Sequence, residues 1–267
     1  MNYISSAQNP VIREVKALKQ KKYREEKGMF FIEGIRFVEE ALKEGVQIHK
    51  ILVSDKLADT TSGSEILEKV NNGGYSVFEL PHKLFVEVSD TQNPQGILAV
   101  LDIKDYNIED IWDNKNFFII LDSIQDPGNM GTIIRTADAA GATGVIVSKG
   151  CVDVYNPKVL RSTMGSVFHV PICLSEDIFK VMDSMKKRGV KICASHLEGN
   201  CDYFELGYKK DIAIIIGNEA NGISEEVKNY ADVLVRIPMP GRAESLNASV
   251  AAGILMYEVL RKNIGKQ

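Results

Sequence analysis

The sequence predicts an α/β protein in two domains, the second of which contains a mostly parallel sheet. Short, nearly continuous apolar runs alternate with segments of helical periodicity, which is typical of parallel strands covered by helices. A polar stretch at 104–116 separates two such series, and 267 residues are enough for two modest domains. We therefore expect a domain at 1–103, a linker at 104–116 and a second domain at 117–267.

The first domain reads as a small α/β unit. A basic segment, which we expect to be helical, precedes the strand "GMFFIEG". In "IRFVEEALKEG" the apolar positions 35, 37, 38, 41 and 42 form the stripe of an amphipathic helix that ends at Gly45. Further strands are expected at "IHKILVS", "YSVFELP" and "GILAVLDI", with the helix "SEILEKVNNGG" between the first two.

The second domain continues the alternation. Strands are expected at "FFIILD", "GVIVS", "VKICAS", "DIAIIIG" and "VLVRIP". Helices are expected after Asn129, near 157–163, near 178–188 and over 245–262. Residues 250–257 are apolar or small almost all round, which predicts that the last helix is deeply buried.

Composition excludes several classes of protein. No apolar run approaches the ~18 residues of a membrane helix, and the N-terminus lacks the pattern of a secretory signal. The four cysteines form no C-x-x-C pair and have no histidines at ligand spacing. We expect reduced thiols, a cytoplasmic location and neither a metal site nor a membrane partner.

The segment "REVKALKQKKYREEK" (13–27) carries seven basic and three acidic residues. It reads either as a solvated helix face, which this feature alone favours, or as a patch for RNA phosphates. The net charge of −4 argues against a strongly electrostatic nucleic-acid binder.

Three loops follow predicted strands, where open α/β sheets bind ligands: "DPGNMGTIIRTADAAG", "IIIGNEANGIS" and "IPMPGRAESLNASVAAG". In the first, a turn leads to Asn129 at a helix entrance, and Arg135 lies off the apolar stripe. Its glycines do not form the G-x-G-x-x-G of a dinucleotide site. In the second, Gly217 permits a close backbone approach to a ligand.

Each loop also has a purely structural interpretation. Asn129 and Ser245 can serve as N-caps, Arg135 can pair with Asp138, and Glu219 can sit near a helix N-terminus. These roles leave Asn247 unexplained, because a buried polar side chain at the start of an apolar helix needs a partner.

Taken together, the three loops resemble, in order and spacing, the three motifs of the SpoU/TrmH family of RNA ribose 2′-O-methyltransferases in the SPOUT superfamily. "YNPKVLRSTMGSVFHVPI" (155–172) is also similar to that family. The segment from "NPVIREVKALK" to "RFVEEAL" resembles the family's substrate-binding domain, which is similar to the ribosomal protein L30e fold. The resemblance implies a deep trefoil knot in the second domain, although knots are rare among folds.

The resemblance also implies a cofactor and a set of site residues. Family members bind S-adenosylmethionine in a bent shape among the knot loops. The implied cofactor contacts are Gly217, Ile237, Leu246, Ser195, Asn218 and Met239, with the loop from Ser195 to Gly199 beside them. Arg135 is the implied central residue of the reaction, with Asn129, Glu219, Ser245 and Asn247 shaping the site.

The implied reaction transfers a methyl group from a sulfonium to a ribose 2′-hydroxyl in structured RNA. We expect Arg135 to hold phosphate and ribose bidentately while a neighbouring oxygen accepts the proton, because a guanidinium is very hard to deprotonate. We also expect a homodimer, with the C-terminal helix and the helix after Asn129 at its interface. The expected substrate is 23S ribosomal RNA, with guanosine favoured. The alternatives are a tRNA methyltransferase, a non-catalytic RNA-binding protein and a dinucleotide-dependent dehydrogenase.

Overall fold

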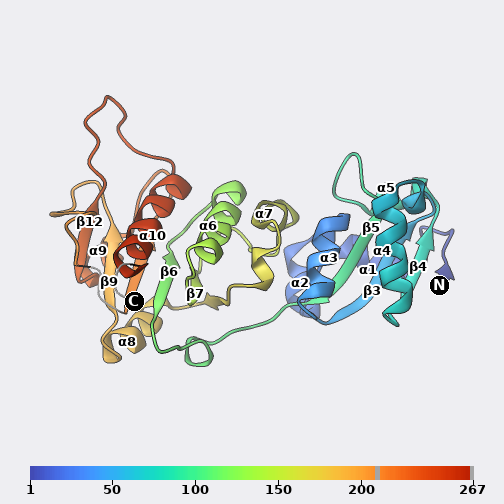
Figure 1. Cartoon of the computed structure of the whole chain (residues 1–267), viewed down its shortest axis with the longest axis horizontal. Helices are drawn as coiled ribbons and strands as arrows, with labels where there is room; N and C mark the ends of the chain where they lie inside the picture. The colour runs from blue at the N-terminus through green and yellow to red at the C-terminus, as the bar shows by residue number, and fades with distance from the viewer. Residues whose placement is uncertain (208–210, 265–267) are drawn as a thin grey trace. The chain divides into compact units, whose positions relative to one another are not determined.

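The computed structural model describes residues 1–207 and 211–264, which form two compact units (Figure 1). The N-terminal unit contains Met1–Lys104 together with Tyr155–Phe168, and the second unit contains the rest of the described chain. The segment Tyr155–Phe168, which we expected in the second domain at 117–267, therefore belongs to the first unit. The chain passes between the units at three points rather than through one linker.

The N-terminal unit is built on a five-stranded mixed sheet of order β1-β4-β3-β5-β2, in which β5 runs antiparallel to both of its neighbours. Its strands are β1 (Asn2–Tyr3), β2 (Met29–Glu33), β3 (Ile48–Ser54), β4 (Val77–Leu80) and β5 (Ile97–Asp102). Its helices are α1 (Pro10–Ala17), α2 (Lys21–Lys27), α3 (Ile35–Lys43), α4 (Thr61–Asn72), α5 (His82–Val88) and α7 (Pro157–Thr163), with 3₁₀ turns at Leu57–Asp59 and Ser166–Phe168. Ile12 and Leu18 of the α1 region pack with Phe85 of α5 in the core.

The basic segment is helical, as expected, but it forms two short helices rather than one. α1 ends at Ala17, and the buried guanidinium of Arg24 donates a hydrogen bond of 2.7 Å to the carbonyl of Leu18. This bond occupies a carbonyl at the end of the helix, which otherwise lacks a partner. Lys16 pairs with Glu87 at 3.1 Å, so part of the segment's charge is already neutralised.

The second unit contains a seven-stranded sheet of order β10-β12-β9-β11-β6-β7-β8, in which every pairing is parallel, as the apolar strands predicted. Its strands are β6 (Phe117–Leu121), β7 (Gly144–Ser148), β8 (Ile172–Ser175), β9 (Lys191–Ser195), β10 (Cys201–Asp202), β11 (Ile212–Ile216) and β12 (Val233–Arg236). Its helices are α6 (Pro127–Ala139), α8 (Ile178–Lys187), α9 (Glu225–Tyr230) and α10 (Ala248–Ile264), with a 3₁₀ turn at Ile108–Asp110. The trefoil knot stays a prediction.

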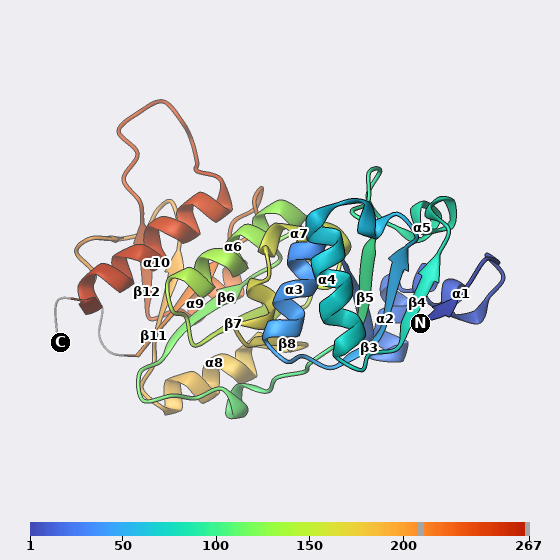
Figure 2. The ribbon, with the colours of Figure 1, turned by 45° about the vertical axis from the view of Figure 1, so that its right-hand side comes forward.

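Helices cover both faces of this sheet. Phe118 and Ile120 of β6 share a core cluster with Met182 of α8 and Val227 of α9. Side chains alternate along a strand, so Ile119 faces the opposite side. On that side α6 and α10 pack against each other, as Figure 2 shows.

The last helix differs from its prediction. It begins at Ala248 rather than near 245, and it is not deeply buried all round. Ala252 and Met256 are fully buried, whereas Val250 is 51% and Tyr257 50% exposed. Both sides of the helix are apolar. One side packs in the core, and no part of the described chain packs against the other.

Two expectations from composition can be compared with the structure. Among residues 1–207 and 211–264, no helix has the length and apolar character to span a bilayer. All four cysteines are free thiols. Burial raises the pKa of Cys193 to about 12, which keeps this thiol protonated and unreactive.

Candidate functional site

A cavity of about 600 Å³ lies at the carboxyl ends of β9, β11 and β12. β9 lies between the other two in the sheet, and because all run parallel their following loops meet at one edge. All six residues predicted as cofactor contacts line this cavity: Ser195, Gly217, Asn218, Ile237, Met239 and Leu246. The structure thus brings them together, and their contact with a cofactor stays a prediction.

The loop after β11 is a tight turn built by Gly217 and Asn218. A Cβ at Gly217 would lie 2.3 Å from the carbonyl carbon of Gly222, closer than any real contact. The loop's own backbone therefore approaches Gly217 closely, and the approach of a ligand at this residue stays a prediction. Asn218 exchanges backbone hydrogen bonds of 2.8 and 2.9 Å with Gly222, and its Nδ2 donates 2.8 Å to the carbonyl of Ser123.

Glu219 reaches from this turn to the start of α6. Its Oε2 accepts the amide N–H of Gln125 at 3.1 Å. Its Oε1 accepts the amide N–H of Asp126 at 3.1 Å and Nδ2 of Asn129 at 2.9 Å. Partial burial raises the pKa of Glu219, but the hydrogen bonds from Asn129, Gln125 and Asp126 outweigh it, and the net pKa lies below 4.5.

Asn129 connects this carboxylate to the third loop. It is buried, and its Oδ1 accepts Nδ2 of Asn247 at 2.9 Å. Oδ1 of Asn247 in turn accepts the amide N–H of Ser249 at 2.9 Å, at the start of α10. We call Glu219, Asn129 and Asn247 the three-loop bridge, because they tie together the loops after β6, β11 and β12.

The bridge corrects the capping interpretations. Asp126 is the N-cap of α6, accepting the amide N–H of Asn129 at 2.8 Å. The side chain of Asn247, not that of Ser245, bonds the first amides of α10. Ser245 is exposed and lines the cavity.

Arg135 is the one predicted site residue in neither the bridge nor the cavity lining. It is exposed on α6, six residues after the buried Asn129. Six residues place it about 120° around the helix from Asn129. Asp138, its suggested ion-pair partner, lies 2.9 Å from Nδ1 of His169 instead.

Two residues of α9 that line the cavity were not predicted. Glu225 and Lys228 form an ion pair at 3.4 Å. The sequence "SEEV" could have predicted the start of α9. Ser224 is the N-cap and accepts the amide N–H of Val227, and two glutamates follow in the first turn of the helix.

Comparison with known proteins shows the family to which the chain belongs. The model of the SpoU rRNA methylase family matches residues 116–257, and that of the MRM3-like substrate-binding domain matches residues 9–99. The chain belongs to the SpoU methylase family, with a substrate-binding domain before the catalytic one.

Individual relatives match nearly the whole chain. The 23S rRNA (guanosine(2553)-2′-O)-methyltransferase RlmP of Bacillus subtilis is 36% identical, over 97% of this chain and 99% of its own. The AdoMet-bound rRNA methyltransferase of Sinorhizobium meliloti has a TM-score of 0.87 at 34% identity, covering 98% of both chains. The SpoU methyltransferase AviRb of Streptomyces viridochromogenes, in complex with AdoMet, has a TM-score of 0.89 at 29% identity, covering 97% of this chain and 100% of its own.

Glu219→Gln is expected to lower the free energy of unfolding by about 1 kcal/mol at pH 7, because an amide nitrogen replaces an oxygen that accepts N–H groups. The folded pKa is depressed below 4.5, so the stabilisation by the carboxylate is present above that pH and is lost as the pH falls through the folded pKa. Urea unfolding over a pH series measures both effects. Glu226→Gln, on an exposed residue of α9, is the control; equal curves for both variants would contradict the bridge.

Gly217→Ala is expected to destabilise the protein by about 1–3 kcal/mol, since the added Cβ meets backbone rather than a movable side chain. Thermal unfolding measures the change. Gly207→Ala is the matched control, because a Cβ there has no atom within 4 Å. An unchanged melting temperature for Gly217→Ala would show that the turn is not as tight as described.

Proposed function

We propose that this protein is an S-adenosylmethionine-dependent methyltransferase that modifies a ribose 2′-hydroxyl in 23S ribosomal RNA. The observation that carries the proposal is the convergence of the loops after β9, β11 and β12 on one cavity, tied to α6 by the three-loop bridge. A dinucleotide-dependent dehydrogenase is disfavoured by the family match, which covers the whole of that cavity's lining.

The lining fits such a cofactor. Its volume lies within the about 300–1,000 Å³ of small-molecule sites. Ile216, Ile237 and Leu246 offer apolar surface for an adenine ring, and Ser195 offers a hydroxyl. When bound, S-adenosylmethionine supplies a methyl group already activated by its sulfonium.

The residues of the chain then have mainly to align the reacting atoms and to manage one proton. Glu219 acts as a positioning residue, because both of its oxygens accept N–H groups and its pKa is lowered. Arg135 holds the phosphate and ribose of the target nucleotide through its planar pair of donors. A non-catalytic RNA-binding protein would have no chemical need to keep this set.

Transfer of tritium from labelled S-adenosylmethionine to unmethylated 23S rRNA tests the proposal. Arg135→Lys is expected to lose about 10²-fold in kcat, because a lysine cannot make the bidentate contact. Arg13→Lys, on an exposed residue of α1, is the control. No label in RNA from the wild-type protein would refute catalysis, stabilisation by NAD alone in a thermal shift would favour a dehydrogenase, and near-full turnover by Arg135→Lys would refute bidentate holding.

The exposed side of α10 supports a homodimer. Val250 and Tyr257 are exposed on α10, and Arg135 is exposed on α6, the helix packed against it. An exposed apolar face of this kind is typical of a subunit interface. Since Arg135 points away from the bridge of its own chain, we propose that it serves the cavity of a second copy.

The double variant Val250→Asp/Tyr257→Asp is expected to be monomeric and to lose methyl transfer, because buried carboxylates would oppose association. Light scattering after gel filtration measures the mass. Val86→Asp alters another exposed apolar residue, 39% exposed on α5, and should leave the mass unchanged. A wild-type monomer would contradict the dimer.

Ribosomal RNA is favoured over tRNA because the match includes the substrate-binding domain and extends over almost the whole chain. We propose a guanosine as the target, as in the name of the Bacillus relative, and a cytoplasmic location, where ribosomes are. Mapping of 2′-O-methyl groups in RNA from cells with and without the gene identifies the nucleotide.

A further inference from the structure

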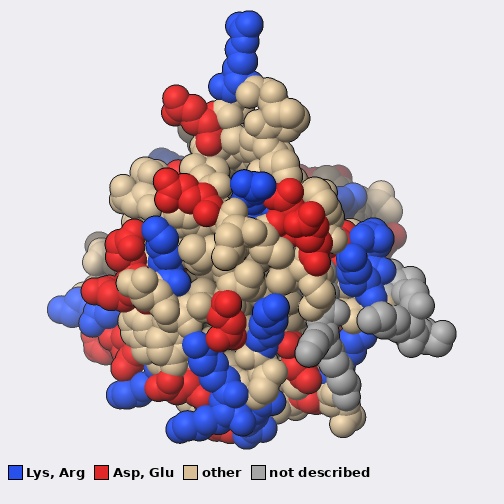
Figure 3. Space-filling view, turned by 90° about the vertical axis from the view of Figure 1, so that its left-hand side faces the viewer, with Lys and Arg blue, Asp and Glu red and all other residues tan. Residues whose placement is uncertain are grey.

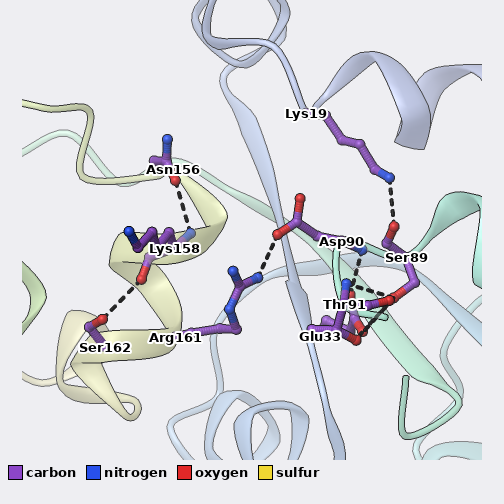
Figure 4. A network of polar contacts seen from close by, with 9 residues as sticks. All are labelled: Lys19, Glu33, Ser89, Asp90, Thr91, Asn156, Lys158, Arg161 and Ser162. Carbon is purple, nitrogen blue, oxygen red and sulfur yellow. Dashed lines mark hydrogen bonds and ion pairs between the residues drawn. The ribbon is translucent and has the colours of Figure 1, made fainter. Parts of the chain in front are cut away.

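A second polar site lies in the N-terminal unit, at the loop 89–96 between α5 and β5, which we call the recognition loop. The carboxylate of Glu33, the last residue of β2, accepts the hydroxyl of Ser89 at 2.5 Å, the amide N–H of Asp90 at 2.9 Å and the hydroxyl of Thr91 (Figure 4). Lys19 donates from the other side to the carbonyl of Ser89 at 2.6 Å. The first half of the loop is therefore fixed.

The second half is fixed as well. Oε1 of Gln95 accepts the amide N–H of Ile35, at the start of α3, at 2.8 Å. Gly96 takes a φ of +87°, and its carbonyl accepts the amide N–H of Ser54 at 2.8 Å. Between these anchors Pro94 restricts the backbone further.

The middle of the loop is exposed. Gln92 and Asn93 are exposed neighbours, and neither side chain makes a hydrogen bond with the described part of the chain. An ordinary surface loop does not need this many hydrogen bonds at both ends to hold two unused amides. A backbone fixed before binding lowers the entropy lost when a ligand is bound.

One cation of α7 faces the loop. Arg161 and Lys158 are both exposed, but the side chain of Arg161 points toward the recognition loop and that of Lys158 points away from it (Figure 4). Nη1 of Arg161 lies 2.6 Å from the Asp90 carboxylate, and these side chains are 39% and 30% exposed (Figure 4). A half-exposed ion pair of this kind contributes little stability, so an external anion can replace Asp90 as the partner of Arg161.

The same helix ends in an unusual residue. Met164 has a φ of +52°, a left-handed conformation that costs a non-glycine residue energy, and it is 61% exposed. It lies one residue after the end of α7 and three after Arg161. It thus adds exposed apolar surface close in sequence to Arg161.

From these observations we infer that the recognition loop and the exposed face of α7 bind an unpaired segment of the substrate RNA. The amides of Gln92 and Asn93 match the hydrogen-bonding edges of bases, which only unpaired nucleotides offer fully. When RNA binds, the ion pair of Arg161 with Asp90 is replaced by an ion pair of Arg161 with a phosphate. The side chain of Met164 provides an apolar contact for a base. This inference rests on the proposed function, because it assigns part of the RNA recognition that the methyl transfer requires.

Equilibrium binding without cofactor tests the inference, using an unmodified transcript of Bacillus subtilis 23S rRNA and a fully paired RNA duplex as probes. Gln92→Ala/Asn93→Ala is expected to raise Kd for the transcript about tenfold and to leave Kd for the duplex unchanged. Asn71→Ala/Asn72→Ala, two exposed amides at the end of α4, is the matched control. An unchanged Kd for the first variant, or an equal loss on both probes, would overturn base reading by the loop.

The exchange at Arg161 has its own readout. Arg161→Ala should raise Kd and lower the salt slope of binding by about one. Asp90→Asn should lower Kd by up to about fivefold, because it frees Arg161 for a phosphate. Weaker binding by Asp90→Asn would show that the ion pair only supports the loop. Lys69→Ala, which breaks the exposed pair with Glu39, is the control and should change neither.

The two proposals fail in different ways. Binding of the transcript by the recognition loop without any methyl transfer would refute the proposed catalytic activity and support the proposed RNA binding by the loop. Methyl transfer by a wild-type protein whose loop variants bind normally would refute the loop and leave the enzyme. Absence of binding to both probes would overturn this inference.

Discussion

The catalytic unit depends on one buried amide, that of Asn129. Its Nδ2 donates to the Glu219 carboxylate while its Oδ1 accepts from Asn247, so one side chain joins two loops that are distant in sequence. Only a side chain with a donor at one end and an acceptor at the other can do this. An aspartate would set a second negative charge against Glu219, and a leucine would leave Glu219 and Asn247 without these hydrogen bonds. These bonds connect the loops that surround the cavity to one another.

Both the strands and the site loops of the second unit could be predicted from the pattern of apolar runs. In a parallel sheet, consecutive apolar runs end at one edge, so the residues just after them converge without any knowledge of the contacts. This is why Ser195, Gly217 and Ile237 lie around one cavity. The short elements β1, α5, β8, β10 and α9 escaped prediction because two to seven residues carry too little periodicity to separate them from turns.

The partners of polar residues could not be predicted in this way. Asn129 was weighed as an N-cap because it precedes an apolar helix, yet Asp126 competes for that role and takes it, which leaves Asn129 for the bridge. Hydrophobic pattern likewise cannot tell a buried face of a helix from an exposed apolar one. Val250 and Ala252 are equally apolar in sequence, but one is half-exposed and the other fully buried. Such differences depend on which segment of chain lies opposite, and this is a property of the tertiary structure.

Charge places a further constraint on how an acidic protein holds RNA. With a net charge of −4 the chain lacks the broad positive field that gives most non-specific binders their affinity. Basic and acidic side chains are mixed over most of the face that Figure 3 shows, and basic ones gather only at its lower edge. In the basic segment of the N-terminus, Arg24 is buried and Lys16 is paired. In the RNA recognition inferred above, affinity comes instead from a few cations and from hydrogen bonds to bases. Recognition of that kind depends little on salt and strongly on RNA structure, which suits an enzyme that must find one nucleotide in a long folded RNA.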